Sequence, residues 1–282
     1  MPTYSTPTPI DLAVDVQAGA LEVVAGERDD TVVTVSPTSP AKEADRRGAE
    51  ETTVAFDGRR LTVVTPKPRF SVIGPKESVD VRVELPAGSR LTAEIAFGSV
   101  RTAGRLGATR IKALGGGAHV ETTGDLWVRA GHGNVSGVAA DGDAEVVADH
   151  GSIRLGRVSG GAVLKASHGS VAVEEVAGDL EANLSYGDLE VTRALGSVVA
   201  KTAYGSIRLD EVGSGSVEAD SGYGEVSVGV REGVPAWLDL TSKNGRVRNE
   251  LAADRAPDAA EQVVAVRVRT KFGDVHVRRV PR

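Results

Sequence analysis

A glycine recurs every nine residues between Gly151 and Val212, and this period constrains the fold more than any other feature of the chain. The segment reads GSIRLGRVS, GGAVLKASH, GSVAVEEVA, GDLEANLSY, GDLEVTRAL, GSVVAKTAY and GSIRLDEV. A His or Tyr ring precedes the glycine only in every second unit, so the full period is 18 residues. Such a fixed period is typical of a solenoid, in which each repeat buries its apolar face against its neighbours.

Within one unit, apolar residues alternate as they do in a half-buried strand. Ile153 and Leu155 point to one face of a strand, and Arg154 points to the other. A strand of about five residues plus a corner fills each unit, and glycine provides the positive φ that a corner needs. We therefore predict an all-β parallel β-helix (β-solenoid) with 18-residue coils, each made of two nine-residue strand–turn units. Right-handed crossovers are expected. The rigid period disfavours the alternative, a β-sandwich of hairpins.

The regularity of the pattern divides the chain into three regions. Residues 1–93 form a β-rich N-terminal region with two loop insertions, at 36–52 and 65–78, and supply the first, irregular coils from about residue 10. Residues 94–250 form the regular solenoid. Residues 251–282 contain an insertion loop, 251–262, followed by strands that are expected to cap the stack.

Composition excludes several classes of function. A net charge of −6 argues against a general nucleic-acid binder. The absence of cysteine excludes disulfides and thiolate metal sites, and we expect no cofactor. No apolar run reaches the length of a membrane span. Residues 1–16 lack the basic and apolar regions of a secretory signal, so we expect a cytoplasmic location.

Six ring side chains fall one coil apart and should lie in a single column. They are His132, His150, His168, Tyr186, Tyr204 and Tyr223. One hypothesis is a metal-binding or pH-sensitive interaction strip. The other is a ladder of stacked rings that caps the corner. We favour the ladder, because three histidines without carboxylate partners are a poor metal signature.

Neither calcium binding nor catalysis has a strong signature. Calcium-binding nine-residue repeats need an aspartate at the sixth position of each unit. The residues at that position form no carboxylate ladder: they are Gly156, Lys165, Glu174, Asn183, Thr192, Lys201 and Asp210. Carboxylates that a polysaccharide-active enzyme would need are scattered over different corners, at Asp179, Asp188 and Asp210. An enzyme of that class is the weakest alternative. Trp127 and Trp237 are interpreted as packing residues at coil edges.

The two ends of the chain carry opposite charge. Residues 1–30 contain six carboxylates and one arginine, and residues 264–282 contain six cations and one carboxylate. Open solenoid edges invite pairing with another chain, and a head-to-tail contact that does not close grows into a filament. The residues expected at such a contact are Asp11, Asp15, Glu22, Arg267, Arg269 and Lys271. Alternatively, the same charges protect the edges and keep the protein monomeric.

Several segments resemble a known family. These are VRVELPAGSRLTAEIAFGSVRTAG, the repeats GSIRL and GDLEV, KTAYGSIRLDEV and the N-terminal VQAGALEVVAGERDDTVVTVSP. Across essentially the whole chain they resemble actinobacterial β-strand-repeat proteins of unknown function that are classed as proposed adhesins. The resemblance implies a β-helical fold and no established enzymatic activity. The absence of a signal peptide departs from what a surface adhesin needs.

These observations predict a non-catalytic interaction or scaffold protein. It would be adhesin-like and bind a protein or glycan partner through a rigid repeat surface. The alternative is a self-assembling cytoplasmic scaffold that stacks head-to-tail, and a homo-oligomer is therefore possible. Nucleic acid and a membrane span are not expected.

Overall fold

The computed structural model of the chain describes residues 2–67, 76–251 and 263–281. Most of the two predicted insertions 65–78 and 251–262 therefore lies outside the described residues. Two compact units make up the chain, Met1–Asp141 and Gly142–Arg282. Both are built mainly from parallel strands stacked as a β-solenoid, which confirms the predicted fold class.

The second unit contains the regular repeat, and its first five layers follow the sequence. They are β12 (Ala144–His150) with β13 (Ile153–Val158), β14 (Ala162–His168) with β15 (Val171–Val176), β16 (Leu180–Tyr186) with β17 (Leu189–Ala194), β18 (Val198–Tyr204) with β19 (Ile207–Val212), and β20 (Ser216–Tyr223) with β21 (Val226–Arg231). Ala144 pairs with Ala162, and Ile153 pairs with Val171. This register confirms the 18-residue coil read from the sequence.

The core of this unit is a stack of small aliphatic side chains. Inward-facing residues such as Leu164, Val173 and Val191 are at most 2% exposed. Each such side chain contributes about 1.5–3 kcal/mol of transfer free energy on burial. Because every layer covers the layer before it, the interior is continuous and needs few aromatic residues.

The two corners of a coil need glycine for different reasons. At the corner after the ring column, Gly187 has a φ of +144°, and a Cβ there would lie 2.2 Å from the carbonyl oxygen of Gly169. At the other corner, Gly178 has no positive φ, but a Cβ would lie 2.7 Å from the Gly160 backbone. In the regular coils the predicted role of glycine as a source of positive φ therefore holds for the first corner, and at the other corner only the irregular turn before β20 has it, at Gly215 (φ +75°). The second corner needs glycine because successive layers approach closely.

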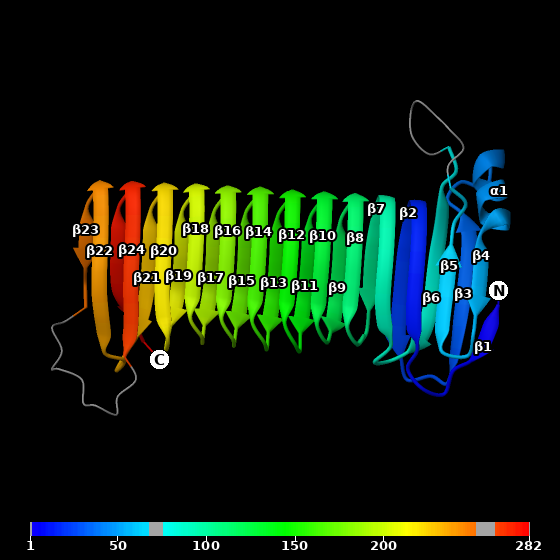
Figure 1. Cartoon of the computed structure of the whole chain (residues 1–282), viewed down its shortest axis with the longest axis horizontal. Coiled ribbons are helices and arrows are strands. Elements are labelled where there is room, and N and C mark those ends of the chain that lie inside the picture. The colour runs from blue at the N-terminus through cyan, green and yellow to red at the C-terminus, as the bar shows by residue number, and fades with distance from the viewer. Residues whose placement is uncertain (1, 68–75, 252–262, 282) are drawn as a thin grey trace. The chain divides into compact units, whose positions relative to one another are not determined.

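The C-terminal layers of this unit do not follow the sequence. β24 (Val264–Phe272) lies between β20 and β22 (Ala236–Asn244), and β25 (Val275–Val280) lies between β21 and β23 (Val247–Asn249). Figure 1 shows β24 inside β22. The last strands in the chain therefore form the penultimate layer instead of the predicted cap, and β22 with β23 forms the end layer.

The strand order of the first unit also departs from the sequence at its own end. β2 (Asp11–Gly26) pairs in parallel with β7 (Arg90–Ala103) on one side, with Gly19 opposite Gly98. On its other side it pairs with β5 (Arg60–Val64) and β6 (Val79–Pro86). The first long strand of the chain is thus an inner layer (Figure 1).

Antiparallel strands and a helix cover the outer side of this layer. β3 (Asp30–Pro37) pairs with β6, β4 (Thr53–Phe56) pairs with β5, and β1 (Thr3–Ser5) pairs with β3, all antiparallel. Helix α1 (Glu43–Glu51) lies in the predicted insertion 36–52 and packs on β3 and β6. Its buried Asp45 carboxylate accepts hydrogen bonds from the backbone N–H groups of Ser39 and Ser78.

The regular coils of the first unit stack on the far side of β7. They consist of β8 (Thr109–Gly115), β9 (Ala118–Thr123), β10 (Leu126–His132) and β11 (Val135–Ala140). β8 pairs with β7 and β10, and β9 pairs with β7 and β11, all in parallel.

Candidate binding groove

Six rings of the second unit stack in one ladder along the corner that precedes the glycine. They are His150, His168, Tyr186, Tyr204, Tyr223 and Phe272, with neighbouring centroids 4.8–5.1 Å apart and interplanar angles of 3–9°. This spacing matches the separation of hydrogen-bonded strands, about 4.8 Å. Phe272 follows Tyr223 because β24 is the strand that stacks on β20.

His132 was predicted to belong to the same column and lies in the first unit. It ends β10, and its register partner on β8 is Gly115, which has no ring. Gly115 in turn pairs with Phe97 on β7. Within that unit, a glycine therefore interrupts the column.

Between His150 and Phe272 the ladder presents ring edges, because both faces of each intervening ring are covered by neighbouring rings. Tyr186, Tyr204 and Tyr223 are each about half exposed, at 51%, 47% and 48%. Their accessible parts are therefore edges and hydroxyl groups. Among the described residues, no group of three or more His, Cys, Asp or Glu side chains could hold a metal ion.

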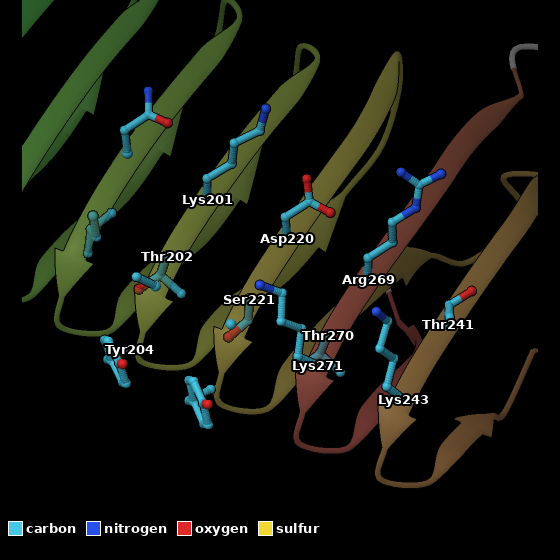
Figure 2. Close-up of a pocket in the computed structure, with 15 residues that line it drawn as sticks. Lys201, Thr202, Tyr204, Asp220, Ser221, Thr241, Lys243, Arg269, Thr270 and Lys271 are labelled. Carbon is cyan, nitrogen blue, oxygen red and sulfur yellow. The ribbon is translucent and has the colours of Figure 1, made fainter.

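An open groove of about 640 Å³ runs beside the C-terminal half of the ladder (Figure 2). The shape of the groove depends on the size of one residue in each strand, the residue that directly precedes the ladder position. Ala203 on β18 and Gly222 on β20 are small and leave a depression, whereas Lys271 on β24 and Lys243 on β22 extend from the neighbouring strands. A second row on the same strands, Lys201, Asp220, Arg269 and Thr241, lines the other side of the groove.

A column of hydroxyl groups forms the floor of the groove. At the same inward position the earlier coils carry Ala148, Ala166 and Leu184. The later strands carry hydroxyl residues, each of which donates to a corner glycine carbonyl: Thr202 to Gly187 (3.3 Å), Ser221 to Gly205 (3.0 Å), Thr270 to Gly224 (3.2 Å) and Ser242 to Gly273 (2.8 Å). The floor is therefore hydrogen-bonded and held in place.

The groove is cationic, although the whole chain carries a net charge of −6. Lys201, Lys243, Arg269 and Lys271 are all exposed, and Asp220 is the single carboxylate among the lining residues. Within the described part of the chain, none of these four cations forms a salt bridge.

Several cations elsewhere on this unit are neutralised by carboxylates. On the strands of the opposite half-coil, Arg193 lies 2.9 Å from Glu175 and 3.4 Å from Glu211. Burial alone would raise the pKa of Glu211, but hydrogen bonds and charges from Arg231 and Arg193 outweigh it and hold the pKa below its usual value. The hydrogen bonds that Arg193 donates to Glu175 and Glu211 raise the pKa of Arg193. Among the described residues, single cations without a salt bridge, such as Arg154 and Lys165, also occur elsewhere on this unit, but in the groove four of them converge.

The acidic residues predicted for an end-to-end contact lie on β2, one layer inside the first unit. Asp11 accepts a 2.8 Å hydrogen bond from Arg90, which holds the pKa of Asp11 below its usual value. Asp15 accepts from Gln17 (2.9 Å), and Glu22 pairs with Arg82 (2.6 Å). These carboxylates are thus engaged by their neighbours within the unit.

The basic residues predicted for that contact lie on β24, one layer inside the second unit. Arg267 pairs with Asp239 at 3.1 Å. Arg269 and Lys271 line the groove instead. Sequence reasoning missed Lys201 and Lys243 as their neighbours. The 18-residue register could have linked Lys201 to the ring column, but the placement of β24 between β20 and β22 has no signal in the repeat pattern.

The three aspartates considered for catalysis form hydrogen bonds or ion pairs that stabilise the coils. Asp179 accepts a hydrogen bond from the Ser197 N–H group (2.8 Å), and Asp188 accepts one from the Ser206 N–H group (2.7 Å), in each case one coil later. Asp210 pairs with Arg208 and Arg278, each at 3.4 Å. The structure therefore gives each of them a stabilising partner.

The two tryptophans differ in their surroundings. Trp127 is half-buried and lies beneath the Arg110 guanidinium, whose central carbon is 3.6 Å from the ring centroid. Trp237, on the end strand β22, is 55% exposed, so its predicted packing role is wrong. It is exposed because it lies on the outward face of β22, beside Ala265 of β24, whereas the next residue, Leu238, faces inward beside Val266. No helix of the described residues is long and apolar enough to cross a membrane.

Solved structures that align with the chain include a proposed cell adhesion protein from Clostridium sporogenes ATCC 15579 (9% identity, TM-score 0.21, covering 99% of this chain and 98% of that one). Others are proposed adhesins from Parabacteroides merdae ATCC 43184 (12%, 0.34, 99% and 95%) and Parabacteroides distasonis ATCC 8503 (16%, 0.31, 99% and 95%). With TM-scores below 0.5, these likenesses carry no argument about fold or function.

A search of curated proteins finds no match. A family profile, in contrast, matches nearly the whole chain. The profile is described as Toastrack DUF4097, and the match spans residues 10–279. The chain belongs to the Toastrack DUF4097 family.

Proposed function

We propose that this protein is a non-catalytic binding protein that holds a protein or glycan partner on the face formed by β16, β18, β20, β24 and β22. The observation that carries the proposal is the groove beside the ring ladder. It combines four unpaired cations, a fixed floor and a rim of exposed aromatic edges on a rigid sheet. A concave site with a few convergent polar groups is the usual form of a binding site.

Rigidity supports binding in preference to chemistry. The ionisable groups that sequence analysis weighed for catalysis, Asp179, Asp188 and Asp210, are bonded to corner amides or arginines. A site whose backbone is fixed by strand pairing on both sides loses little conformational entropy when a partner binds.

The test is to block the groove selectively. The chain has no native cysteine, so Ala203→Cys can be labelled at a single site with a maleimide polymer. Arg154→Cys, on the strand β13 of the other half-coil, is the matched control, since residue 154 is also exposed. We expect the unlabelled protein to bind members of defined glycan or protein arrays. The label at residue 203 should abolish that binding, and the label at residue 154 should leave it intact. Absence of binding to both arrays, or equal effects of the two labels, would contradict the proposal.

Self-association through the end layer of the second unit is the second candidate, and a different observation favours it. Leu238 and Leu240 of β22 face inward but are only half-buried, whereas Val266 and Val268 beside them on β24 are fully buried. Trp237 and Val247 of the same layer are 55% and 45% exposed. An unpaired strand with uncovered apolar residues is a template for pairing with another chain.

The occupant that we propose for this edge is a second copy of the same chain. An antiparallel pair of β22 strands centred on Thr241 places Asp239 of one copy opposite Lys243 of the other, twice, so charges match across a two-fold axis. Light scattering over a range of concentrations should detect a dimer. Leu238→Lys, which places a charge at the edge, should return it to a single chain. A constant monomer mass at all concentrations would eliminate this candidate.

A further inference from the structure

We infer that the groove binds a linear acidic glycan, a sugar chain carrying carboxylate or sulfate groups. This inference rests on the proposed binding function and names the class of its ligand. It follows from the charge of the groove and from the direction in which the groove runs. It also follows because strand addition and stacking on ring faces are disfavoured there.

Charge indicates an anionic ligand. Lys201, Lys243, Arg269 and Lys271 converge on one groove without ion-pair partners in the described part of the chain, although the whole chain carries a net charge of −6. Uncompensated cations that repel one another destabilise a surface unless an anion relieves the repulsion. Arginine is well suited to planar carboxylates and to sulfate-like oxyanions, because its N–H groups form a fork.

The cations are spaced along the stacking direction. Lys201 on β18 and Arg269 on β24 share one register row and are separated by the single strand β20, hence by about 10 Å at the usual strand spacing. Lys243 lies one strand further, on β22. A repeating anionic polymer laid across the strands would meet a cation at intervals, and Asp220 between them can accept hydrogen bonds from sugar hydroxyl groups.

Strand pairing disfavours an acidic peptide as the occupant. Extended peptides usually gain affinity by adding a strand to a free sheet edge. β18, β20 and β24, which carry Lys201, Asp220, Arg269 and Lys271, are each paired on both sides, so their backbone groups are already used, and among the described strands of the groove only β22, at its end, keeps a free edge. The groove crosses these strands and offers a ligand mainly side-chain groups, which suits a polyhydroxylated chain better than a polypeptide.

Ring stacking disfavours single-stranded nucleic acid. Proteins that bind such strands stack the bases on exposed aromatic faces. In the ladder, the faces of Tyr204 and Tyr223 are covered by the rings on either side. The same geometry excludes stacking of a sugar ring on those faces, so recognition must come from charges and hydroxyl groups.

The probes are oligogalacturonate, which carries carboxylates, and dextran sulfate, with unsubstituted dextran and polyglutamate as comparisons. Binding is measured by titration calorimetry with the full chain at low and moderate salt. We expect at least one acidic glycan to bind and dextran not to bind. Its affinity should fall as salt screens the cations. Which acidic glycan binds distinguishes a carboxylate ligand from a sulfate ligand.

Variants locate the site. The double variants Lys201→Gln with Arg269→Gln, and Lys243→Gln with Lys271→Gln, should each weaken acidic-glycan binding about three- to tenfold. The matched control is Lys165→Gln. Lys165 is exposed in the same register row as Lys201, two strands away and outside the groove, so the change should leave affinity within about twofold.

Three results would overturn the inference: binding of dextran as tight as that of the acidic glycans, binding of polyglutamate as tight as theirs, or equal affinity in the control and both double variants. Failure of the acidic-glycan inference can be distinguished from failure of the proposed binding function. If a neutral glycan or a protein binds the arrays and the label at residue 203 blocks it, the binding function stands and only the acidic-glycan assignment fails.

Discussion

At the scale of single residues, the glycine that follows each ladder ring is where the backbone tolerates least change. Gly187 combines a φ of +144° with a close approach to Gly169, whereas Gly233 has a φ of +80° and no atom within 4 Å of a Cβ built there. We expect Gly187→Ala to lower the free energy of unfolding by about 2–4 kcal/mol and Gly233→Ala by about 1 kcal/mol. Urea unfolding measures both. Equal losses would show that crowding by the neighbouring layer is unimportant.

The carboxylate of Glu211 predicts a pH dependence. Its pKa lies below the usual 4.5, because its bonds to Arg231 and Arg193 outweigh burial. A group whose pKa is lowered on folding stabilises the protein above its ordinary pKa, and this stabilisation is lost as the pH falls through the folded-state value. Glu211→Gln should therefore cost about 1 kcal/mol at pH 7 and progressively less below pH 4.5.

Urea unfolding at several pH values measures this difference. Glu174→Gln is the control, since Glu174 is exposed and forms no salt bridge among the described residues. If the loss for Glu211→Gln is the same at low and neutral pH, the ion pairs do not stabilise the fold.

At the scale of elements, the ring ladder links layers outside the aliphatic core. Tyr186 stacks on His168 at 5.1 Å and on Tyr204 at 4.9 Å. Tyr186→Ala removes both contacts and should destabilise the second unit by about 1–2 kcal/mol. Tyr186→Phe keeps both ring contacts and should change the free energy of unfolding by less than about 0.5 kcal/mol. Chemical denaturation of the two variants makes the comparison. A large loss in the Phe variant would assign the stabilisation to the hydroxyl group.

The strands of the regular coils could be predicted from the sequence because one period determines them. Alternation defines the inward residues, such as Ile153 and Leu155, and the 18-residue register aligns His150 with His168. The groove could not be predicted in the same way. It depends on small residues, Ala203 and Gly222, next to long ones from a strand that is not adjacent in sequence. A single-sequence period holds no information about that neighbour.

At the scale of the whole molecule, each unit places a chain-terminal segment one layer inside its end. β2 lies between β7 and the β5–β6 layer, and β24 lies between β20 and β22. Sequential stacking is the simplest expectation for a repeat, because neighbours in sequence close the shortest loops. The observed layer order needs the same inward alternation of apolar residues as sequential stacking does. Alternation in the sequence therefore cannot distinguish the two orders.

This order predicts the pattern of hydrogen exchange. In the second unit, amides of β24 and β25 should exchange more slowly than those of β22 and β23, although β24 and β25 are nearer the C-terminus of the chain. The reason is that β24 and β25 are bonded on both sides and β22 and β23 on one side among the described strands. Exchange measured by mass spectrometry on peptides from 236–249 and 264–280 gives the comparison. Faster exchange in 264–280 would contradict the layer order.

The inner position of β2 and β24 also determines how the units respond to tension applied at the chain ends. An outermost strand can be peeled away one hydrogen bond at a time, at low force. Once the three-residue strand β1 has yielded, a pull on the N-terminus draws β2 lengthwise between two parallel neighbours. A pull on the C-terminus loads β25 in the same way, between β21 and β23. Many bonds must then break together, so β2 and β25 are expected to resist shear.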